Sequence, residues 1–139
     1  MVYQQIIRQS GKKYLRRWVL RLPWGWSLRW HVFEGPDAYV PHDHPFWFAS
    51  IGLWGAASEE LFAVKPNQPP VLRKSRLMLP LLPRFYRSTH VHRIDKLLTK
   101  KMYTLVLTGR RIRGWGFWAQ HGWVAHRDFT LPGDGAVNV

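Results

Sequence analysis

The sequence Pro41-His42-Asp43-His44-Pro45 places two histidines one residue apart between two prolines. On an extended backbone, residues i and i+2 project to the same side with Cα atoms about 7 Å apart, so both imidazoles can lean onto one ion. The prolines restrict the backbone and reduce the entropy lost on metal binding. The same pair also fits a simpler interpretation, in which the histidines cap a turn and Asp43 makes local hydrogen bonds.

A second pair of histidines follows in residues 86–94, which we expect to form one β-strand. One face of that strand would carry Tyr86, Ser88, His90, His92 and Ile94. Because either histidine of this pair can supply a third ligand, the candidate metal ligands are His42, His44, His92 and His90. Three imidazoles with an open position suit a divalent transition metal (Fe, Mn, Ni, Zn or Cu), and the geometry would select among them.

Short runs rich in aromatic and β-branched residues surround these histidines, separated by proline and glycine, which predicts many short strands in one sandwich or barrel. Residues 14–22 and 26–34 are expected to form a hairpin across Pro23-Trp24-Gly25. In its second strand, Trp26, Leu28, Trp30 and Val32 alternate with Ser27, Arg29 and His31, the pattern of a half-buried strand.

The remaining expected strands are residues 46–54, 58–64, 71–78 (basic, at an edge or on an exposed face), 102–108, 111–118 and 123–129. Residues 111–118 would pair with 102–108 across Gly109-Arg110. We expect residues 1–12 to form a loose arm or short helix, and residues 79–85 a loop with some buried leucines. Residues 13–130 would then form a single barrel domain, followed by a flexible tail, 131–139.

The charge balance is strongly basic, since 21 Lys and Arg against 8 Asp and Glu give a net charge of +13. This field favours an anionic partner, whether a small molecule, nucleic acid or an acidic protein surface, although a solvated basic exterior needs no partner. The absence of cysteine excludes disulfides, thiolate metal sites and thiol catalysis. No signal peptide is visible, and the longest apolar stretch is shorter than the roughly 20 residues of a membrane span, so we expect a cytoplasmic protein without membrane association.

These motifs resemble the cupin superfamily (RmlC-like), and most closely small cupin-like proteins of bacteria and phages. The shared blocks are His42–Phe46, His92-Arg93, Thr104–Gly109 and Arg113–Phe117, within a resemblance that runs from Trp18 to Phe129. The resemblance implies a small antiparallel jelly-roll barrel, all-β, with a metal held by His-x-His and a later histidine. His92 matches that later position better than His90.

The acidic ligand that cupins carry shortly after His-x-His is missing, because Trp47, Phe48 and Ala49 occupy that stretch. Glu59 and Glu60 lie further along, and either could reach inward. The cupin barrel hosts oxygenases, isomerases and plain binding proteins, so the fold alone does not choose a function.

Two functions follow as hypotheses. The first is a metal-dependent enzyme, of oxygenase or isomerase type, that acts on a small anionic substrate. The candidate substrate-binding residues are Arg113, Trp115, Phe48 and Tyr86, with the Arg113 guanidinium orienting the negative group. The second is a non-catalytic basic module, phage-like, that binds nucleic acid or an acidic protein. A homodimer is compatible with both.

Overall fold

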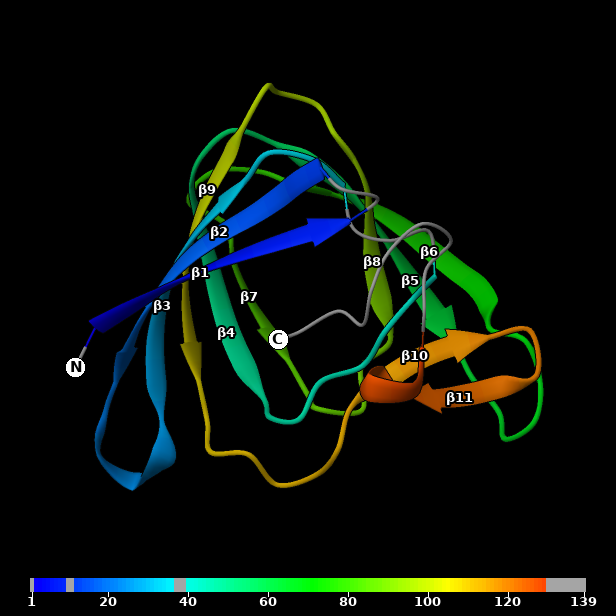
Figure 1. Cartoon of the computed structure of the whole chain (residues 1–139). Helices are drawn as coiled ribbons and strands as arrows, with labels where there is room; N and C mark the ends of the chain where they lie inside the picture. The colour runs from blue at the N-terminus through cyan, green and yellow to red at the C-terminus, as the bar shows by residue number, and fades with distance from the viewer. Residues whose placement is uncertain (1, 10–11, 37–39, 130–139) are drawn as a thin grey trace.

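The structure is a computed structural model that describes residues 2–9, 12–36 and 40–129, and its regular elements are nearly all β-strands (Figure 1). The strands are β1 Val2–Gln9, β2 Lys12–Arg21, β3 Ser27–Phe33, β4 Phe48–Trp54, β5 Ala57–Ala63, β6 Val71–Met78, β7 Pro83–Tyr86, β8 His92–Leu97, β9 Met102–Thr108, β10 Gly116–Ala119 and β11 Gly122–Ala125. Two short 3-10 turns, η1 Pro23–Gly25 and η2 His126–Asp128, are the helical segments of these ranges. Neither is long and apolar enough to cross a membrane.

The strands form two sheets that face each other and a separate two-stranded hairpin, β10-β11. Every pairing between named strands is antiparallel. The larger sheet has the order β1-β2-β3-β9-β4-β7, and the smaller has the order β6-β5-β8 (Figure 1). His42 lies between β8 and the β10-β11 hairpin, because it forms one antiparallel bridge with His92 and another with Phe117. The all-β antiparallel barrel predicted from the sequence is confirmed.

One end of the barrel is closed by an apolar row across the larger sheet. Ile7, Leu15, Phe33 and Met102 are consecutive partners in the register of β1, β2, β3 and β9. All four are buried and pack in one cluster with residues of the opposite side, namely Ala57, Ile94, Trp115 and Phe117. Burial of this row provides the main hydrophobic stabilisation that holds the two sheets together.

The hairpin of β2 and β3 forms as expected, but its second strand turns its polar face inward. Ser27, Arg29 and His31 line the interior, whereas Trp30 on the opposite face is 37% exposed. The outward Trp30 ring packs against Tyr103 of β9, with ring centroids 6.0 Å apart. The alternation of polar and apolar residues therefore predicted the strand. It did not predict that the polar face of β3 points inward, toward the cavity described below.

Several of the local predictions are wrong. The expected strand 123–129 ends at Ala125, because residues 126–128 form the 3-10 turn η2. Residues 2–9 form β1, the edge strand of the larger sheet, and not a loose arm or helix, because Val2–Gln9 pairs with β2 along its length. In residues 79–85 the chain forms β7 from Pro83, and Leu79, Leu81 and Leu82 are exposed rather than buried. The predicted tail at 131–139 lies outside the described residues.

The predicted strand 86–94 is broken in the middle. β7 ends at Tyr86, and a turn follows in which the amide of His90 donates to the carbonyl of Arg87 (3.0 Å). β7 pairs with β4 in the larger sheet and β8 pairs with β5 in the smaller, so the turn carries the chain from one sheet to the other.

The predicted pairing of residues 111–118 with 102–108 is also wrong. β9 pairs with β3 and β4 instead, and β10 starts only at Gly116 and pairs with β11. After β9 the chain runs along the histidine segment, where the amide of Gly109 donates to Trp47 and that of Ile112 donates to Pro45. Glycine is required at position 109, since a Cβ there would collide with the Trp47 ring.

Candidate metal centre and its cavity

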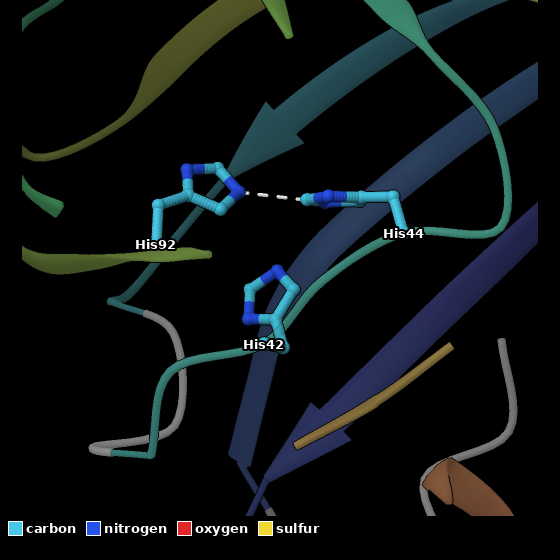
Figure 2. Close-up of side chains that lie close together, drawn as sticks. All are labelled: His42, His44 and His92. Atoms are coloured by element: carbon cyan, nitrogen blue, oxygen red, sulfur yellow. Dashed lines mark hydrogen bonds between the residues drawn. The ribbon is translucent and has the colours of Figure 1, made fainter. Parts of the chain in front are cut away.

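Three imidazoles converge on one point from two separate segments of the chain (Figure 2). The ring centroids of His42, His44 and His92 form a nearly equilateral triangle, with separations of 5.0, 5.0 and 4.9 Å. One ligand nitrogen from each ring lies within 4.8 Å of the others. The structure thus brings together His-x-His and the later histidine, which are 48 residues apart in the case of His44 and His92.

Backbone pairing sets the register of this cluster. The amide of His42 donates to the carbonyl of His92 (3.0 Å), and the amide of His92 donates back to the carbonyl of His42 (3.1 Å). The amide of His44 donates to the carbonyl of Ser88 (3.1 Å). Because these bonds fix both segments, the three rings are held together by main-chain geometry before any ligand is considered.

Asp43, between the two histidines, points away from the cluster and is 2% exposed. Its Oδ1 accepts a hydrogen bond from the amide of Gly116 (2.8 Å). Its Oδ2 accepts from the indoles of Trp118 (3.3 Å) and Trp123 (3.0 Å) and from the guanidinium of Arg113 (3.2 Å). Asp43 therefore ties the histidine segment to the β10-β11 hairpin through long-range bonds, not through the local turn bonds expected from the sequence.

Arg113 completes the same connection. Its Nη1 donates to the carbonyls of His44 and Ser88, both at 3.1 Å, while its Nη2 is bound to Asp43. Arg113 does not line the cavity next to the histidines. The structure thus gives this side chain a role in fixing the histidine segment, and its predicted contact with a substrate stays a prediction.

Glu59 is a carboxylate in direct contact with the cluster and is completely buried. Its Oε2 lies 2.7 Å from His92 Nδ1 and accepts a hydrogen bond from the Tyr86 hydroxyl (2.8 Å), and its Oε1 accepts from Arg76. Burial raises the pKa of Glu59, but the hydrogen bond and charge of His92, the Tyr86 bond and the Arg76 charge outweigh it and lower the pKa to about 2. Glu59 is therefore ionised and accepts the Nδ1–H of His92.

This bond has a direct consequence for metal binding. With its Nδ1 proton held by Glu59, His92 presents the lone pair of Nε2 to the cluster, the arrangement that metal-bound histidines typically show. Glu60, the alternative carboxylate, forms an ion pair with Arg93 (2.9 Å) instead. Glu59 occupies the inward position of an alternating stretch, Ala57, Glu59 and Leu61, and a charged residue at a core position is the sequence signal for such a role.

The donor set fits a divalent transition metal. The Nε2 atoms of His44 and His92 are 3.4 Å apart, a separation compatible with two nitrogens that each lie about 2.1 Å from one ion. Burial, together with the nearby charges of His92, His42, His90 and Arg29, lowers the pKa of His44 well below its usual value, so this imidazole is neutral at physiological pH. Its Nδ1 is buried without a hydrogen-bond partner among the described residues.

His90, the competing candidate for the third ligand, does not belong to the cluster of converging nitrogens. Its ring lies 5.4 Å from His92 and 5.1 Å from Tyr86, measured between centroids. Burial, followed by the charge of His92, lowers the pKa of His90 to about 4. His92 is thus the third histidine of the cluster, as the cupin resemblance implied.

The histidines open onto a cavity of about 610 Å³ inside the barrel. Three of the four predicted substrate-binding residues, Phe48, Tyr86 and Trp115, line this cavity. Phe48 stacks on Tyr86 (4.4 Å between centroids) and meets the edge of His44 (4.6 Å), so these rings form an apolar wall beside the cluster. Whether they bind a substrate stays a prediction.

Apolar side chains make up much of the remaining lining, but its charged side chains are basic, a feature that the sequence does not predict. Among the described residues, the lining includes Arg17, Arg21, Arg29, His31 and Arg111 but no aspartate or glutamate. The signal in the sequence is the polar side chains at alternate positions of residues 27–31, a pattern that does not by itself say which face is buried.

No family model matches the sequence, and no curated protein is a significant match. Solved structures do match the fold. They include KdgF from a Halomonas species (TM-score 0.55, 14% identity, 78% of this chain and 89% of that one) and Fe(II)-HppE with an alternative substrate (TM-score 0.60, 10% identity, 77% and 55%). An oxalate decarboxylase variant from Bacillus subtilis also matches (TM-score 0.53, 11% identity, 80% and 29%). The match therefore spans most of KdgF but about half of HppE. The chain shares its fold with these proteins, and the predicted antiparallel jelly-roll barrel is confirmed.

Proposed function

We propose that the protein is a metal-dependent enzyme of cupin type that acts on a small anionic substrate. His42, His44 and His92 would hold a divalent transition metal, with Fe, Mn, Ni and Zn as the candidates. The observation that carries the proposal is the location of three converging imidazoles at the wall of a cavity whose charged lining residues are basic, with no carboxylate among the described residues.

The chain's own residues prepare the site in three ways. Glu59 fixes the tautomer and ring orientation of His92. Asp43 and Arg113 fix the backbone that carries His42 and His44. Phe48 and the other aromatic rings exclude water from one side of the cluster. A bound divalent metal would supply Lewis acidity, which polarises an oxygen of the substrate.

The test is elemental analysis of protein purified without chelators, alongside two variants. We expect about one metal ion per chain, and loss of that metal in His42→Ala and His44→Ala. The control is His121→Ala, since His121 is exposed and outside the cavity lining. Metal-free wild-type protein, or equal metal content in His44→Ala and wild type, would refute the proposal.

A second candidate function, binding of nucleic acid by a basic module, is favoured by one observation. Trp24 in η1 is 81% exposed and Trp26 is 37% exposed, so these rings are accessible for stacking on bases. Affinity for single-stranded nucleic acid should then fall steeply between about 50 and 200 mM salt and also fall in Trp24→Ala. Binding that is indifferent to salt would exclude this function.

A further inference from the structure

We propose that Arg29, Arg17, His31 and Thr104 form a subsite in the cavity that binds the oxyanion head group of a small molecule, a carboxylate or a phosphate. Assigning that molecule as substrate rests on the proposed function, whereas binding of the anion itself does not require the metal. The subsite takes the place of Arg113 as the group that orients the negative charge.

Strand register places these side chains together on the inner surface of the larger sheet. Arg17 of β2 is the direct partner of His31 of β3, and His31 is the direct partner of Thr104 of β9. Arg29 occupies the next inward position of β3, because inward side chains recur every second residue. All four line the same cavity as the three histidines.

The guanidinium of Arg29 is already oriented. Its Nε donates to Ser27 Oγ (3.0 Å), and Ser27 Oγ lies 2.7 Å from Thr108 Oγ1. The guanidinium carbon lies 4.8 Å from the centre of the Phe46 ring, on which it stacks. These contacts use the Nε and one face of the group, and no described residue accepts a hydrogen bond from its two terminal nitrogens. Those nitrogens form the fork that binds carboxylate or phosphate oxygens.

Arg17 is buried deeply beside it, with 5% exposure. Its Nε donates to the side chain of Gln5 (2.6 Å), an uncharged partner. Arg17 lacks an ion pair with any carboxylate of the described residues, and the same is true of Arg29. By contrast, Arg16 on the opposite face of β2 pairs with Glu34 (3.0 Å).

His31 and Thr104 contribute neutral polar atoms without partners. His31 Nε2 and Thr104 Oγ1 are both buried and make no hydrogen bond with any described residue. Thr104 is only 2% exposed, so its hydroxyl depends on an occupant of the cavity for a partner. A neutral imidazole and a hydroxyl can each donate one hydrogen bond to an oxyanion.

Electrostatics favour an anion at this place. Burial and the charge of Arg17, with a smaller contribution from Arg21, lower the pKa of Arg29 to about 10 against an opposing effect of Tyr3. A buried charge that lacks a partner is costly, and a bound anion would remove this cost. Two adjacent guanidiniums therefore select an anion over a neutral ligand of similar shape.

The experiment is a calorimetric titration of metal-stripped protein with inorganic phosphate, and separately with acetate, at constant ionic strength in chloride. Stripping the metal prevents direct binding of either anion to it. We expect saturable binding in wild type and at least tenfold weaker binding in Arg29→Gln. Arg29→Lys, which keeps the charge but loses the fork, should fall between them.

Arg73→Gln is the matched control, since it removes the same charge from an exposed position of β6, and it should bind as wild type does. Tighter binding of phosphate than of acetate would identify a phosphoryl group, and the reverse a carboxylate. Equal affinity in Arg29→Gln and wild type, or no saturable binding of either anion, would overturn the subsite. Absence of metal in the native protein would refute the proposed function while leaving phosphate binding unchanged, so the two failures are distinguishable.

Discussion

The substitution Asp43→Asn tests whether one buried carboxylate holds the histidine segment in place. Asp43 Oδ1 accepts one hydrogen bond and Oδ2 accepts three. The side-chain amide of an asparagine has only one oxygen, so in either of its two flipped orientations its NH2 group must face at least one hydrogen-bond donor. The less costly orientation places the amide nitrogen against the amide of Gly116 and keeps the three bonds to the remaining oxygen.

The cost of this orientation can be worked from its parts. One hydrogen bond to a charged acceptor is lost, at about 1.5–3 kcal/mol, and a buried donor is left unsatisfied, at about 1–3 kcal/mol. The ion pair with Arg113, whose side chain is 33% exposed, contributes no more than about 1 kcal/mol. We therefore expect Asp43→Asn to lower the free energy of unfolding by about 2.5–7 kcal/mol, the sum of these parts.

The assay is urea unfolding followed by tryptophan fluorescence and circular dichroism, with Asp128→Asn as control. Asp128 is exposed in η2, so its substitution should change stability by less than about 0.5 kcal/mol. A change below about 1 kcal/mol in Asp43→Asn would refute the reasoning, because it would mean that the bonds to Asp43 are replaced by water without cost.

Three further outcomes are expected. Glu59→Gln should weaken metal binding by about 10- to 100-fold in a chelator competition assay, because an amide does not fix His92 as a carboxylate does; an unchanged affinity would contradict this role. The lowered pKa of Glu59 should make the free energy of unfolding fall by about 3 kcal/mol in total as the pH drops from about 4.5 to about 2. The contribution of the ionised carboxylate is fully present above the pKa of the unfolded state, and it is lost as the pH falls through the pKa of the folded state. Urea unfolding at several pH values measures this loss, and Glu59→Gln should show a flatter profile. Arg29→Met should leave the melting temperature in chloride unchanged or higher, since it removes a buried charge that has no ion-pair partner. The same variant should abolish the rise in melting temperature that phosphate causes in the wild type. A lower melting temperature in chloride would show that Arg29 stabilises the fold instead.

The local patterns of the sequence predicted much of the strand content. The hairpin of β2 and β3, the strand β9 and the basic edge strand β6 follow from alternation and from glycine and proline at their ends. Local patterns failed where the chain crosses between sheets. Tyr86–His92 reads as continuous alternation, yet a turn splits it, because the partner of a strand is chosen by contacts far away in the sequence.

The site divides in the same way. His-x-His and the later histidine pair were visible in the sequence because metal ligands need particular side chains at particular spacings. The sequence left open which of His90 and His92 joins the cluster, and backbone pairing of His42 with His92 determines that choice. Spacing alone does not report which strand lies beside which.

The sequence by itself therefore determined an antiparallel β fold and the residue types of a candidate metal centre, since periodicity predicts the first and local spacing the second. Only the tertiary structure decided that Glu59 orients His92, that Asp43 and Arg113 anchor the histidine segment, and that Arg17 and Arg29 face inward. The physical reason is that a strand has two faces of opposite character. Which face points inward depends on what lies opposite that face in the fold. Here the polar face of β3 borders a cavity beside three histidines, and the charged residues that line this cavity are basic.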